Sequence, residues 1–165
     1  MANNYLQRNL NSLKTSNNTN YNLTPLQNWC SDCWFFFYKD LEKELLGKTA
    51  YVRITKGGYF MFSYACSKTT FDNQNLNLFI KIHQDTLTFC LSDNEEDNRK
   101  LKRDFFVKKI LDKASDQKIN VKEIGHLGRI MSLVKLQGDY RVKNKKDLMN
   151  LPVTIKILKN LIKLI

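Results

Sequence analysis

The sequence predicts an α+β fold in a single domain. Apolar residues between positions 24 and 46 recur at three- and four-residue spacing, which is typical of an amphipathic helix. Residues 76–91 instead alternate apolar and polar side chains, as strands with one buried face do. A length of 165 residues suits one domain with its own core. We therefore expect an N-terminal helix, an antiparallel sheet of about five to six strands, a charged helix and a C-terminal amphipathic helix.

The N-terminal part divides into a polar arm and a helix. Residues 1–22 are rich in Asn and poor in large apolar side chains, which predicts a flexible arm before a domain over residues 23–165. Thr24 and Pro25 suit the cap and first turn of a helix that ends at Gly47. The stripe expected to face the core is Leu26, Trp29, Cys30, Cys33, Phe37, Leu41 and Leu45. Trp34 and Phe35 fall partly off this stripe and are candidates for contact with another element or a partner.

The remaining elements follow in order. Strands are predicted at 51–55, 59–66, 76–83, 86–91, 121–124 and 130–136. A charged helix should begin at Ser92 or Asp93 and end near Gln117, burying Phe106, Val107, Ile110, Leu111 and Ala114. The last helix starts near Pro152 and is amphipathic and basic. Its apolar positions favour docking against the domain over lying on a membrane surface.

The net charge of +11 is unevenly distributed. Residues 1–98 contain 9 basic and 10 acidic side chains, whereas residues 99–165 contain 18 basic and 6 acidic ones. Such asymmetry indicates a polyanionic partner: nucleic acid, a nucleoprotein complex, an acidic protein surface or an anionic membrane, of which the first two are favoured. The alternative is a lysine-rich surface that is simply solvated.

The candidate contact residues lie in this basic half. The last hairpin and the loop after it contribute Arg129, Lys135, Tyr140, Arg141, Lys143, Lys145 and Lys146, and the charged helix contributes Arg99, Lys102 and Arg103. Lys and Arg side chains that contact phosphates give salt-dependent affinity without demanding a sequence. Tyr140 is a candidate stacking group among them.

Signs of catalysis are weak. The sequence contains no phosphate-binding loop, zinc-protease motif or serine-hydrolase elbow, and we expect no catalytic residue, metal, cofactor or small-molecule substrate. Cys30 and Cys33 form a CxxC about two turns inside the predicted helix, without two further ligands nearby, so buried thiols are favoured over a zinc or redox site. A diverged metal-dependent nuclease is the least favoured reading, with Asp116 or Asp139 as its carboxylates.

The region from Gly58 to the end resembles a known family. The stretches 58–62, 76–82, 86–90, 98–109, 128–134 and 138–141 follow in order, and the final helix carries Ile155, Leu158 and Lys159. These stretches resemble the C-terminal accessory region of bacterial PD-(D/E)XK nuclease superfamily proteins. The acidic motifs of that family lie upstream of this region, and we expect no room for them here. The resemblance implies an accessory or inhibitory module, in phage or mobile-element defence or counter-defence.

Taken together, the sequence predicts a non-catalytic basic protein that engages nucleic acid or a nucleic-acid-processing complex. With no signal peptide and no apolar run of membrane-spanning length, a cytoplasmic protein without a membrane partner is expected. The alternative is a protein–protein inhibitor or adaptor of a defence nuclease, using the aromatic side chains near Trp34 and Phe35.

Overall fold

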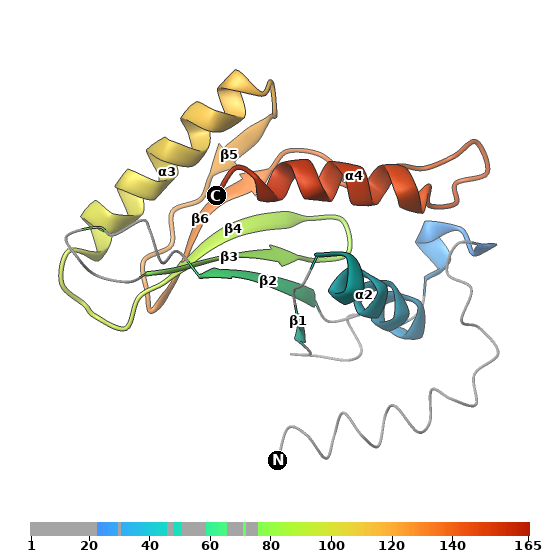
Figure 1. Ribbon diagram of the computed structural model, residues 1–165, viewed down its shortest axis with the longest axis horizontal. Coiled ribbons are helices and arrows are strands. Elements are labelled where there is room, and N and C mark those ends of the chain that lie inside the picture. The colour runs from blue at the N-terminus through green and yellow to red at the C-terminus, as the bar shows by residue number, and fades with distance from the viewer. Residues whose placement is uncertain (1–22, 30, 46–47, 51–58, 66–70, 72–75) are drawn as a thin grey trace, which may run out of the picture.

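The computed structural model describes residues 23–29, 31–45, 48–50, 59–65, 71 and 76–165. The predicted arm over residues 1–22 and the predicted strand over residues 51–55 lie outside this described part. The described residues form an α+β arrangement, as the sequence predicts (Figure 1).

The sheet is antiparallel throughout and has six strands in the described part of the chain, in the order β1-β2-β3-β4-β6-β5. Their bounds are β1 (Lys48–Ala50), β2 (Tyr59–Ala65), β3 (Asn77–Ile82), β4 (Leu87–Ser92), β5 (Val121–Glu123) and β6 (Ile130–Leu136). The two edge strands, β1 and β5, have 3 residues each, and the inner strands have 6 or 7. The chain passes from β4 through α3 to the edge strand β5. It then returns as β6, which lies between β5 and β4.

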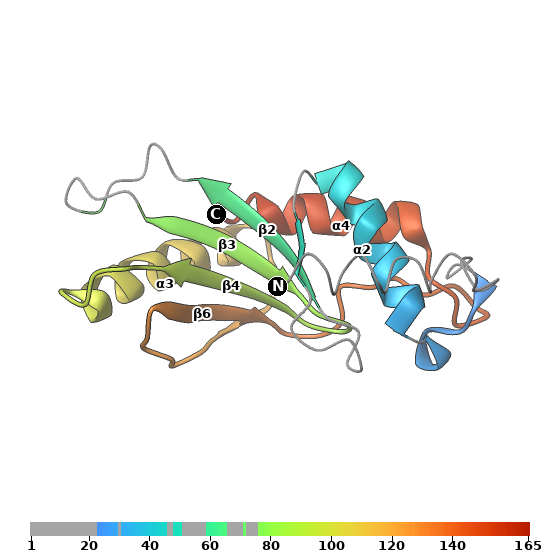
Figure 2. The same cartoon turned by 90° about the horizontal axis from the view of Figure 1, so that it is seen from below.

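Helices cover one face of this sheet. They are α2 (Ser31–Leu45), α3 (Arg99–Asp116) and α4 (Leu151–Ile162). Figure 1 shows α3 and α4 above the strands, and Figure 2 looks onto the opposite face, where β2, β3, β4 and β6 lie in front of them. No helix in the described ranges has the length and apolar character of a membrane span.

One core joins the sheet to all three helices. It extends from Leu26 to Leu164 and includes the inward positions of β3, β4 and β6, which are Leu78, Ile80, Ile82, Leu87, Phe89, Leu91, Met131, Leu133, Val134 and Leu136. A β-bulge at Phe89/Cys90 turns both Leu133 and Val134 into buried positions. In α4, Thr154, Leu158 and Leu161 are buried, and the Asn150 side chain caps the helix at the backbone N–H of Val153. The docking of α4 against the domain is therefore confirmed.

The start of the first helix differs from the prediction. Pro25 precedes a short 3-10 turn, η2 (Leu26–Asn28), and Trp29 is extended, so the α-helix begins only at Ser31. The Trp29 indole Nε1 donates to the Thr24 carbonyl at 2.9 Å while its ring is buried. Burial of this large ring outweighs the local preference for a continuous helix, because packing routinely overrides propensity.

The start of α3 is also later than predicted. Asn98 is left-handed, with φ of 60°, and the helix begins at Arg99 with no acidic residue in its first turn. Asp93 does not cap the helix. Its carboxylate accepts from the Glu95 backbone N–H at 3.0 Å and from Lys102 Nζ at 2.9 Å. A buried ion pair therefore replaces the expected helix cap.

Candidate nucleic-acid interface

Two of the predicted contact residues are buried structural cations. The exposed fractions are 2% for Lys102 and 7% for Arg103. Lys102 pairs with Asp93, and Arg103 Nη2 lies 2.6 Å from Glu123 Oε1 and 2.6 Å from the Ile124 carbonyl oxygen. The prediction that these side chains face solvent or a ligand was wrong, because α3 turns them towards the segment before it and towards β5.

Tyr140 is also part of the core. Its exposed fraction is 1%, and its hydroxyl donates to the His83 carbonyl at 2.6 Å. Burial raises the pKa of Tyr140 well above its ordinary value of 10.0. The hydroxyl ties the segment after β6 to the end of β3, so the expected stacking role is contradicted by its position.

Arg141 is held in place by an aspartate and a tryptophan. Its Nε donates to both Asp139 oxygens at 2.9 Å, and its Nη2 donates to Oδ2 at 2.6 Å. The guanidinium carbon lies 5.5 Å from the centre of the Trp34 ring. Burial lowers the pKa of Arg141, but the hydrogen bond and charge of Asp139 raise it overall. Arg141 is therefore a neutralised, packed cation, in contrast to the exposed contact expected from the sequence.

Arg99 and Arg129 lie at the other end of β6. Arg99 Nε donates to the Glu95 carbonyl at 2.9 Å, and Arg129 Nε donates to Asn94 Oδ1 at 3.0 Å. Both therefore brace the segment that leads into α3. The length of β6 separates them from Lys135 and Arg141 by roughly 20 Å. The predicted residues thus do not form one continuous patch.

The loop after Arg141 presents three exposed lysines. Lys143 Nζ lies 2.8 Å from Asp147, whereas Lys145 and Lys146 have no acidic partner in the described part of the chain. The Asn144 side chain accepts from the backbone N–H groups of Lys146 and Leu148, which fixes the loop.

Sheet register brings Lys135, a predicted contact, together with two lysines that the sequence analysis did not single out. Lys81 of β3 pairs with Thr88 of β4, Thr88 pairs with Lys135 of β6, and Lys135 pairs with Lys122 of β5. We call Lys81, Lys135 and Lys122 the lysine row. In the other direction the same register continues from Lys81 through Met61 to Lys48. The sequence alone does not reveal this alignment of lysines. Because α3 separates β4 from β6 along the chain, local patterns do not determine how the two strands pair.

The lysine row crosses the face opposite the helices. Lys122 and Lys135 are exposed and Lys81 is partly exposed. Residues two positions further along each strand lie on the same face. The first line beside the row consists of the paired residues Phe79, Cys90 and Ser132, and the second consists of Asn77, Ser92 and Ile130. None of these neighbouring residues is acidic. Burial lowers the pKa of His83, next to the row, and the charges of Lys81 and Lys135 lower it further against the opposing effect of Asp85. Asp85 therefore offsets part of the charge of the row at this position.

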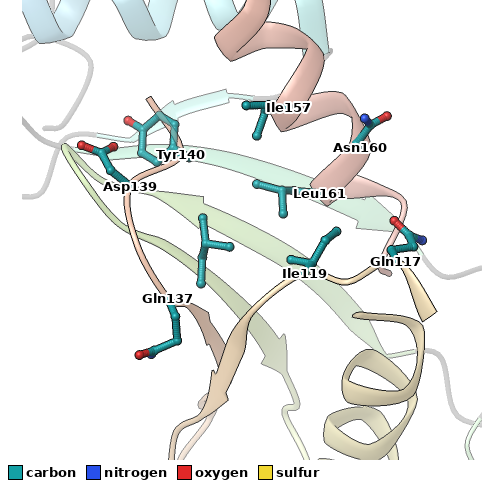
Figure 3. Close-up of a pocket in the computed structure, with 9 residues that line it drawn as sticks. Gln117, Ile119, Gln137, Asp139, Tyr140, Ile157, Asn160 and Leu161 are labelled. Atoms are coloured by element: carbon teal, nitrogen blue, oxygen red, sulfur yellow. The ribbon is translucent and has the colours of Figure 1, made fainter. Parts of the chain in front are cut away.

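Two hollows lie near the C-terminal end of β6. One, of about 320 Å³, is lined by Asp85, Thr86, Lys135, Leu136, Gln137, Gly138, Asp139 and Arg141, and we call it the hairpin pocket. The other, of about 310 Å³, is shown in Figure 3, where Ile157, Asn160 and Leu161 of α4 face Ile119 and Gln117. Its lining contains Asp139 and no basic residue. Only the hairpin pocket shares a cation with the lysine row.

The residues considered for metal or redox chemistry are dispersed. No group of three or more His, Cys, Asp or Glu side chains suited to a metal ion occurs among the described residues. Asp139 is bound to Arg141, and Asp116 ends α3. Cys33 and Cys90 are buried, and burial raises the pKa of the Cys90 thiol. Cys30 and Cys66 lie outside the described residues.

The aromatic surface expected near Trp34 is not formed by that residue. Trp34 has an exposed fraction of 3% and packs edge-on against Trp29 and Phe37 at 4.6 and 6.0 Å between ring centres. The Phe35 side chain lies outside the described residues. A partner surface that uses Trp34 is therefore contradicted by its burial.

Comparisons with protein-family models, with curated proteins and with solved structures found no match for this chain. The resemblance to the accessory region of PD-(D/E)XK nucleases stays a prediction. The candidate interface thus rests on the geometry of the chain itself.

Proposed function

We propose that this chain is a non-catalytic protein that binds nucleic acid, alone or within a nucleoprotein complex, through the lysine row. The observation that carries the proposal is the register that aligns Lys81, Lys135 and Lys122 across one face of the sheet, with no acidic residue at the paired positions on the side of Phe79, Cys90 and Ser132. Lysine ammonium groups neutralise phosphates and release condensed counterions, which supplies affinity without base recognition.

The internal energetics of the row support a bound anion. Lys122 and Lys135 are directly opposite each other on adjacent antiparallel strands, and like charges in that position destabilise a sheet. Neither has an acidic partner in the described part of the chain. A phosphate between them would relieve this repulsion, so the free protein carries a charge arrangement that a polyanion stabilises.

The test is binding to labelled single- and double-stranded DNA and RNA, measured by fluorescence anisotropy and titrated with salt. The variant K122E/K135E should weaken binding roughly 30- to 100-fold and flatten the salt dependence. The matched control is K108E/K156E, which makes the same change in net charge at exposed lysines of α3 and α4. An equal loss in both variants would show that net charge, not the row, binds nucleic acid. Added Mg²⁺ in the same assay reports any cleavage.

A protein partner is a second candidate, favoured by two exposed apolar residues on α3. Leu101 and Phe105 have exposed fractions of 61% and 46% and are one helical turn apart. An adaptor that uses this surface should form a stoichiometric complex that L101D disrupts. The same variant should leave nucleic-acid affinity unchanged, which separates the two candidates.

A further inference from the structure

We infer that the lysine row takes one single strand of nucleic acid, lying across the β-strands, in preference to a duplex. This inference rests on the proposed function, since it specifies the class of nucleic acid bound at the same face. Three features of the face carry it: the width of the charged track, its length and the chemistry of its neighbours.

The charged track is one lysine wide. The next position on the same face lies two residues along each strand, about 7 Å away. At that distance the paired residues are Phe79, Cys90 and Ser132, and one further step along the strands holds Asn77, Ser92 and Ile130. No second line of cations parallel to the first occurs at these described positions. A duplex presents two backbones separated by a groove of about 6 or 12 Å, whereas a single strand needs only one track.

The length of the track sets a small footprint. Neighbouring strands are about 4.8 Å apart, so the three steps from Lys81 to Lys122 span about 14 Å. With three lysines, the salt slope for a single strand should be about −2, at about −0.7 for each phosphate neutralised.

The neighbours of the row favour backbone recognition over base recognition. Thr88 places a hydroxyl group between Lys81 and Lys135 in the pairing order, while Phe79 has an exposed fraction of only 5% and offers little ring surface for stacking. In the hairpin pocket, Asp85 and Asp139 offset the charges of Lys135 and Arg141, so the pocket adds no net attraction for phosphate. The bound nucleic-acid strand should therefore follow the lysine row. Its affinity for the protein should depend strongly on salt concentration and weakly on base sequence.

The experiment compares a labelled 12-nucleotide single strand with a hairpin duplex of the same bases, at matched salt, using the whole chain. We expect the single strand to bind at least about tenfold tighter, with a salt slope near −2. Each of K122Q and K135Q should reduce that slope by about 0.7, whereas the control variants K108Q and K156Q should not change it.

The possible results distinguish the preference for a single strand from nucleic-acid binding itself. Equal or tighter binding of the duplex overturns the single-strand inference and leaves the proposed function standing. Negligible binding of every nucleic acid at physiological salt overturns both. A slope that falls equally in K108Q and K135Q assigns binding to diffuse charge and also overturns the inference. Circular dichroism spectra that match the unmodified protein keep each variant interpretable.

Discussion

Two groups of cations in the C-terminal half behave in opposite ways. Lys102, Arg103 and Arg141 are largely covered, and each contacts a carboxylate. Lys122 and Lys135 are exposed and have no such partner in the described part of the chain. The comparison shows that the local charge excess overstates the binding surface, because much of it belongs to the fold.

Burial explains the difference. A cation removed from water must be paired, since desolvation of an isolated charge costs several kcal/mol. Lys102 therefore fixes the segment before α3 through Asp93, and Arg103 fixes β5 through Glu123. An exposed lysine on a sheet stays hydrated and needs no partner, so it remains available for a ligand.

The largest change in stability is expected when a buried cation is removed. Lys102→Met should lower the free energy of unfolding by about 3–5 kcal/mol, because it leaves the Asp93 carboxylate buried without its counterion. Urea denaturation measures the change. Lys100→Met, at an exposed position on the same helix, should change stability by less than about 0.5 kcal/mol.

A near-neutral result for Lys102→Met would show that the pair contributes little to the fold. The double variant D93N/K102M tests the mechanism. It should recover much of the lost stability, because neither remaining side chain carries a buried charge.

Local patterns predicted the fold well. The alternation in residues 76–91 fixed which side of β3 and β4 is buried, and the stripe ending at Leu45 identified the core side of α2. The starts of α2 and α3 were missed because they depend on tertiary contacts. The Trp29 indole and the Asp93–Lys102 pair decide them, and neither contact is visible from sequence spacing.

The candidate site was less accessible to sequence reasoning. Clustering in the sequence favoured Tyr140 and Arg141, which the structure buries or neutralises. The lysine row consists of residues from three strands, and Lys81 and Lys135 are joined through a register that spans α3. Only Lys135 appeared among the predicted contacts, because long-range pairing cannot be inferred from spacing along one chain.

A smaller effect tests the row through pH. Burial, Lys81 and Lys135 hold the pKa of His83 below its ordinary value of 6.5, so His83 is neutral in the free protein at neutral pH. A bound polyanion raises that pKa, because it favours the imidazolium. Affinity should therefore be flat above about pH 7 and increase about fivefold as the pH falls through the window below 6.5. Anisotropy titrations at constant ionic strength measure it.

His83→Gln is the matched variant for this experiment, since it preserves size and removes titration. It should bind as the unmodified protein does above pH 7 and show no increase below it. If the affinity of this variant still increases as the pH falls, a titratable group other than His83 causes the pH effect. The same depressed pKa lowers stability as the pH falls, so unfolding must be checked at each pH.

The smallest expected change in stability is also the most specific. Lys122→Glu replaces a like-charge pair with an opposite-charge pair directly across from Lys135, and should raise the free energy of unfolding by about 0.2–1 kcal/mol. The same substitution places a carboxylate in the lysine row and should weaken nucleic-acid binding. Stability and affinity therefore change in opposite directions, as expected where selection for binding opposes sheet stability. Lys108→Glu, which makes the same charge change on α3, should reproduce neither effect, and a gain in stability with undiminished affinity would separate Lys122 from the binding surface.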